Sequence, residues 1–203
     1  MSLLKDLDKF LAGQSTLNPA RRHALDEFRK HALRALELLI KQARSPLDRQ
    51  LYEHMAYNVK TNPLMFYPRK VLRYDPVHGS VTQGEHVRSV DVVQRGNEKF
   101  LVQKDYINLP ADLVFAGDQL TLSGVFTMTH EYGHFPKPLL LQFAYRNGIN
   151  IEQAEELLAD ILSAKLARAL GFSLPRILSH FEGRDVVYGG FPFRSYILHA
   201  LRA

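Results

Sequence analysis

The sequence of 203 residues contains no cysteine. Disulfide bonds and thiolate-ligated metal sites are therefore excluded, and any metal ion has to be held by histidine and carboxylate side chains. No apolar run approaches the roughly 18 residues needed to cross a bilayer. The first residues also lack the basic start, apolar run and small-residue cleavage site of a secretory signal. These absences predict a cytoplasmic protein without a membrane span, or one exported by a signal-independent route.

The chain has little excess charge of either sign. Its 26 basic and 21 acidic residues give a formal net charge of +5, and part of the basic excess falls within residues 1–50. Such a balance permits weak binding to nucleic acid or anionic surfaces without requiring it. Charges spaced along a helix usually form its solvated face, so nucleic acid is the less favoured partner. With 46% hydrophobic residues, a single domain over residues 1–203 is expected.

Three regions with different patterning predict an α+β fold. Apolar residues recur at spacings of three and four residues through 19–60. This spacing predicts two helices divided at Ser45-Pro46, the second of which ends at Asn62-Pro63. With a shorter helix expected over 3–11, residues 1–62 form a helical N-terminal layer. From about 71 to 122 short runs rich in Val, Phe and Tyr indicate a small, mainly antiparallel sheet. From about 120 the helical period returns, and the order helices, sheet, helices is that of an α+β protein.

Turn and cap residues place the elements of the second and third regions. A hairpin is predicted to pair 87–94 with 99–106 across Gly96-Asn97. Residues 107–110 and 113–115 are expected to form one further short strand, interrupted by a proline that is tolerated mainly at a sheet edge. The first late helix is expected to run to about Phe135, where Pro136 and Pro138 stop it. A loop should follow, then a second helix capped by Asn150 and ended at Gly171, and a last helix from Arg194.

One short motif carries the chemistry that the sequence predicts. His130, Glu131 and His134 form the pattern HExxH within the first late helix. Positions four apart lie on one face of an α-helix, so both imidazole rings can point at one ion at about 2.0–2.1 Å. Glu131 can then reach a water molecule on the metal without binding the metal, and act as general base. The alternative is that the two histidines merely lie at the end of an amphipathic helix.

A catalytic zinc ion needs a third protein ligand beside an open position. The second late helix offers Glu152, Glu155, Glu156 and Asp160. Glu156 and Asp160 share a helix face with the small residues Ala159 and Ser163, which would let this helix approach the HExxH helix closely. Glu156 is therefore the predicted third ligand. Asp160 is expected to accept the remaining ring N–H of a ligating histidine.

These segments resemble known metallopeptidases. Glu156-Leu-Leu-Ala-Asp160 looks like the ExxxD element of gluzincins, specifically the ExxAD version of the integral-membrane CAAX-protease and heat-shock-protease family. FTMTHEYGHF, residues 126–135, is similar to the FTxAHExGH stretch of ImmA/IrrE-type proteases, whose downstream element is usually ExxAN. The resemblance covers residues 107–170 and implies a zincin-like fold in which His130, His134 and Glu156 bind zinc. It also implies that Glu131 is the general base and that Asp160 supports a ligand.

Stabilising a developing oxyanion takes one more donor from Tyr, His or Arg. The C-terminal tail offers His180, Arg184, Tyr188 and Tyr196, of which Tyr188 and His180 are preferred. Most tyrosines, however, serve only in packing, with the ring buried and the hydroxyl in contact with water.

The sequence thus predicts a soluble zinc-dependent hydrolase, a gluzincin-like peptidase acting on a peptide or protein bound in extended form against the sheet edge. Two alternatives stay open. One is a regulatory ImmA/IrrE-like protein that recognises or cleaves a single partner, such as a repressor. The other is a basic helical binding module in which HExxH is accidental and no metal binds. No sequence pattern indicates an oligomeric state.

Overall fold

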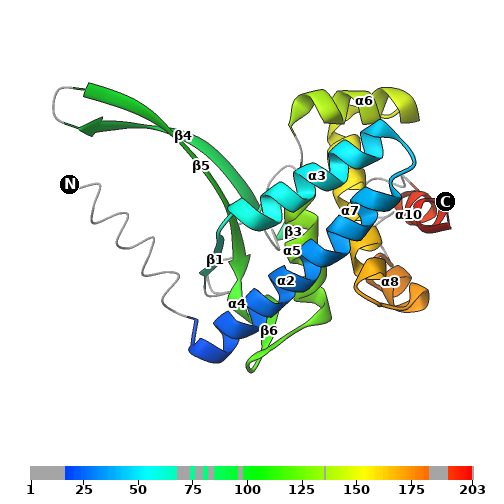
Figure 1. Cartoon of the computed structure of the whole chain (residues 1–203), viewed down its shortest axis with the longest axis horizontal. Coiled ribbons are helices and arrows are strands. Elements are labelled where there is room, and N and C mark those ends of the chain that lie inside the picture. The colour runs from blue at the N-terminus through cyan, green and yellow to red at the C-terminus, as the bar shows by residue number, and fades with distance from the viewer. Residues whose placement is uncertain are drawn as a thin grey trace.

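Helices and a small sheet make up the computed structural model (Figure 1), which confirms an α+β fold. The structure describes residues 17–67, 74–75, 80–81, 85–95, 98–134, 136–182 and 192–202. The helix expected over 3–11 lies outside them. No helix among the described residues is long and apolar enough to cross a membrane.

The first described elements are two helices that lie side by side, α2 (Pro19–Gln42) and α3 (Pro46–Thr61) (Figure 1). Asn18 caps α2, because its side-chain oxygen accepts a hydrogen bond of 2.8 Å from the Arg21 N–H. Ser45 does the same for α3, accepting from the Asp48 N–H at 3.0 Å. The proline at the start of each helix has no N–H of its own that would need a partner. The predicted division at Ser45-Pro46 is confirmed.

The main sheet has the strand order β1-β5-β4, with β1 (Leu64–Tyr67), β4 (Glu85–Arg95) and β5 (Glu98–Pro110). β4 and β5 are antiparallel in the predicted register, with Val87 opposite Tyr106 and Gln94 opposite Lys99. β1 was not foreseen and pairs in parallel with β5. Beyond β1 the two long strands leave the helical body as a ribbon (Figure 1). The Gly96-Asn97 turn lies outside the described residues. A separate antiparallel pair joins β2 (Tyr74–Asp75) to β3 (Ser80–Val81).

The expected strand is confirmed at 107–110 and at Phe115, but these residues do not form one short edge strand, and residues 113–114 are helical. Residues 107–110 are the end of β5, the central strand, where β1 pairs with them. Pro110 is tolerated there because it is the last residue of β5 and directly precedes a helix, α4 (Ala111–Val114). A tight antiparallel pair follows, β6 (Phe115–Ala116) with β7 (Gln119–Leu120), turning at Gly117 with φ of 61°.

The C-terminal region contains α5 (Leu122–Tyr132), α6 (Lys137–Asn147), α7 (Ile151–Ala169), α8 (Leu174–His180) and α10 (Phe193–Arg202). The loop expected before Asn150 is wrong, because α6 occupies it. Pro136 and Pro138 end one helical segment and begin the next, since proline suits the first turn of a helix. Asn150 caps α7 as predicted, and Gly171 follows its C-terminus with φ of 93°.

α7 lies at the centre of the helical body and is buried over most of its length. One hydrophobic cluster joins its Leu158 and Leu162 to α2, α3, α5 and the sheet, with fully buried Leu36 and Met55. A second cluster joins the other side of α7 to α5, α8 and α10. Because both sides of α7 are packed, its position relative to α5 is fixed.

Candidate metal centre

α5 and α7 cross at close range because small residues meet at the crossing. A Cβ atom added to Gly133 would lie 2.9 Å from Ala159 Cα, closer than real Cβ contacts. One turn earlier on α5, Thr129 Oγ1 lies 2.5 Å from Ser163 Oγ, and both residues are buried. The small face predicted from Ala159 and Ser163 therefore does meet the HExxH helix.

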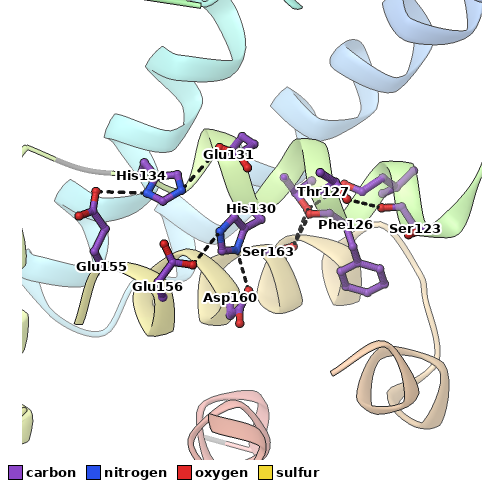
Figure 2. A network of polar contacts seen from close by, with 12 residues as sticks. Ser123, Phe126, Thr127, His130, Glu131, His134, Glu155, Glu156, Asp160 and Ser163 are labelled. Atoms are coloured by element: carbon purple, nitrogen blue, oxygen red, sulfur yellow. Dashed lines mark hydrogen bonds and ion pairs between the residues drawn. The ribbon is translucent and has the colours of Figure 1, made fainter. Parts of the chain in front are cut away.

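His130 projects from α5 between two carboxylates of α7 (Figure 2). Its Nδ1 lies 2.6 Å from Asp160 Oδ1, and its Nε2 lies 3.4 Å from Glu156 Oε2. Asp160 is only 1% exposed. Burial alone would lower the pKa of His130, but the charges and hydrogen bonds of Asp160 and Glu156 outweigh it and raise that pKa to about 10. The ring is thus oriented by Asp160, with Nε2 turned toward Glu156.

His134 lies two residues beyond the end of α5 rather than within it. A tightened turn brings it back toward His130, with Gly133 N–H donating to His130 O at 2.8 Å and His134 N–H donating to Glu131 O at 3.4 Å. The His134 Nδ1 lies 3.2 Å from Glu155 Oε1, and its Nε2 lies 3.6 Å from Glu131 Oε2 (Figure 2).

α3 holds the chain at this turn. The Asn58 side chain is buried, and its amide donates to Tyr132 O at 3.0 Å and to His134 O at 3.2 Å. Carbonyl groups at the end of a helix have no partner within the helix, so Asn58 satisfies groups that α5 itself leaves open. Arg29 of α2 approaches the Tyr132 hydroxyl at 3.4 Å, and burial raises the pKa of that phenol.

Three of the predicted residues form a group suited to a metal ion. One ligand atom from each of His130, His134 and Glu156 lies within 4.8 Å of the other two. Ligand atoms on a tetrahedral zinc ion are roughly 3.3–3.5 Å apart, so His130 Nε2 and Glu156 Oε2 already have that spacing, at 3.4 Å. Two imidazoles and one carboxylate are also donors that zinc accepts.

The two predicted oxyanion donors are placed differently. His180, at the end of α8, stacks on Phe126, one turn before His130 on α5, with ring centroids 4.1 Å apart. Tyr188 lies outside the described residues. A catalytic role for either stays a prediction.

Sequence reasoning gave no role to Asn58 or Glu155. Glu155 was among the acids of α7, but its neighbour Glu156 has the better helical spacing to Asp160. Asn58 is 76 residues from His134 in the chain, and no local pattern indicates that contact.

Comparison of the chain with protein-family models, curated proteins and solved structures found no match.

Proposed function

We propose that the protein is a zinc-dependent hydrolase, a peptidase of gluzincin type, with His130, His134 and Glu156 as zinc ligands. The observation that carries the proposal is the convergence of these three side chains, with each histidine Nδ1 beside a carboxylate of α7. A carboxylate that accepts the Nδ1 proton leaves Nε2 as the metal-binding atom. The resemblance of the two motifs to known metallopeptidases supports the same assignment.

Glu131 is the proposed general base. Glu131 is 6% exposed, and its carboxylate approaches the ligand group without belonging to it, with Oε2 at 3.6 Å from His134 Nε2. A zinc ion held here would lower the pKa of a water molecule and polarise a substrate carbonyl. In the proposed mechanism Glu131 would accept a proton from the attacking water through Oε2 and deliver it to the leaving nitrogen.

The substrate is proposed to bind as an extended strand. β4 is an edge strand of the main sheet, and it packs near α5, which carries the motif. The outer edge of such a strand offers backbone N–H and C=O groups to a peptide.

The variant Glu131→Gln tests the proposal. It should bind one zinc ion with unchanged affinity and lose hydrolysis of a peptide library by about 100-fold or more, because the amide cannot accept the proton. Elemental analysis gives the stoichiometry, and mass spectrometry of the library gives the turnover.

His134→Ala is the matched control, because it should lose zinc as well as activity. If the wild-type chain hydrolyses peptides and Glu131→Gln does so equally fast, this mechanism is rejected. If neither the wild type nor Glu131→Gln retains zinc, the metal assignment is rejected too.

A further inference from the structure

His134 is held differently from its partner His130. His130 lies within α5, so helical hydrogen bonds fix its backbone. His134 follows the helix, beyond the regular helical hydrogen bonds, and its own carbonyl has no partner within α5. A histidine in such a turn keeps a metal-binding orientation only if contacts from outside the helix fix it.

Two such contacts are present, from two different elements. Asn58 of α3 donates from its side-chain amide to the carbonyl of His134 at 3.2 Å and to that of Tyr132 at 3.0 Å. Glu155 of α7 lies 3.2 Å from the Nδ1 of the same histidine (Figure 2). One contact fixes the backbone and the other the ring.

We propose that Asn58 and Glu155 are positioning residues that hold His134 for metal binding from opposite ends of the residue. The proposal rests on the proposed function, because it assumes that His134 is a ligand. Glu155 fixes the ring through the Nδ1 proton, which directs Nε2 toward His130 and Glu156. Asn58 fixes the backbone of His134, from which the ring extends. The N-terminal helical layer is thereby a part of the metal site.

The two residues differ in burial, which separates their expected effects. The Glu155 side chain is 41% exposed, so its removal should change the site with little effect on folding. Asn58 is 3% exposed, and its removal takes a donor from the carbonyl groups of Tyr132 and His134, which also lowers stability. Glu155 therefore provides the cleaner test.

The experiment measures zinc affinity by competition with a chromophoric chelator. Glu155→Ala and Asn58→Ala should each weaken zinc binding by about 10- to 100-fold, the usual effect of removing a partner of a ligating histidine. Glu155→Gln should restore most of the affinity, because its amide oxygen still accepts the Nδ1 proton. A merely structural role for Glu155 gives no reason for this rescue.

Matched controls lie on neighbouring parts of the fold. Glu152→Ala removes another exposed acid from α7, three residues earlier. Asn147→Ala removes a similar amide, which donates to Phe143 O at the end of α6 at 2.9 Å. Both controls should bind zinc like the wild type. If Asn58→Ala does not fold, Asn58→Ser takes its place, and its affinity should lie between those of wild type and Glu155→Ala.

The outcomes separate this proposal from the proposed function. Zinc binding by the wild type that depends on His130, together with unchanged affinity in Glu155→Ala and in the Asn58 variant, overturns the positioning roles and leaves the metal site standing. A wild type whose zinc binding does not depend on His130 overturns both. Loss of affinity in Glu152→Ala equal to that in Glu155→Ala also overturns the positioning role, because the effect would then be general electrostatics of α7.

Discussion

His130 is the residue whose chemistry depends most on its neighbours. Asp160 and Glu156 face its two ring nitrogens, at 2.6 and 3.4 Å. A ring between two carboxylates gains by carrying both protons, which offsets the cost of burying the charge. The same arrangement suits a cation at Nε2, so a metal ion and a proton compete for one atom.

Zinc uptake is therefore expected to release a proton and to strengthen with pH. The His130 pKa is raised from 6.5 to about 10, so between these values the metal-free ring is protonated and zinc must displace the Nε2 proton. The apparent affinity should rise by up to about tenfold per pH unit for one displaced proton. Calorimetry at about pH 8, in two buffers with different ionisation enthalpies, gives the number of protons released.

Asp160→Asn is the control for this pH dependence. It removes the charge that contributes most to raising the His130 pKa. The variant should therefore release fewer protons per zinc ion at the same pH. Equal proton release by wild type and Asp160→Asn would contradict the assignment of the displaced proton to His130.

Some residues of the site could be predicted from the sequence, and others could not. Helical spacing places Glu156 and Asp160 on one face of α7, and the structure sets both beside His130. Asn58 reaches the same site across a contact between residues 76 positions apart in the chain, which depends on how α3 packs. Periodicity specifies which residues share a face, whereas only the tertiary packing decides which faces meet.

At the scale of elements, the site depends on the short distance between α5 and α7. Gly133 needs no unusual backbone angle, since its φ is −82°, so its importance is one of space. An added Cβ would meet Ala159 Cα at 2.9 Å and Ala159 O at 3.2 Å. These are backbone atoms of a helix packed on both sides, so neither helix can give way cheaply.

Gly133→Ala is expected to destabilise the fold by about 1–3 kcal/mol and to weaken zinc binding, because α7 carries Glu156 away from α5. Urea unfolding measures the first effect and chelator competition the second.

Gly148→Ala is the control for Gly133→Ala, because it strains the backbone without pushing two helices apart. Its added Cβ meets nothing within 4 Å, but its φ of 64° disfavours a side chain. It should cost about 1–2 kcal/mol in stability without changing zinc affinity. A Gly133→Ala variant with wild-type zinc affinity would show that the crossing distance does not control the site.

Elements with strong local signals were predictable, and those defined by distant pairing were not. Asn150 caps α7 as the sequence predicts, and the N-terminal helices divide at Ser45-Pro46 as expected. β1 has four residues and owes its existence to parallel pairing with β5, more than 40 positions away in register. α6 was missed because Pro136 and Pro138 were interpreted as stops, although proline equally begins a helix.

At the scale of the whole molecule, the first hydrophobic cluster indicates whether the N-terminal helices belong to the folding unit or are only attached to it. Leu36 of α2 and Met55 of α3 are fully buried in the cluster that also contains Ile107 and Leu158. Without α2 and α3, one side of α7 would expose apolar surface, and the turn at His134 would lose Asn58. Both losses predict that the helical layer belongs to the folding unit.

A chain shortened to residues 63–203 is therefore expected to show no cooperative thermal transition and no stoichiometric zinc. Circular dichroism and elemental analysis test this, and residues 1–62 supplied as a separate chain should restore part of both signals. A shortened chain that melts cooperatively and binds zinc as tightly as the full chain would make residues 1–62 an appendage. Since α2 and α3 supply fully buried side chains to the cluster under α5, the expected result is loss of fold and metal together.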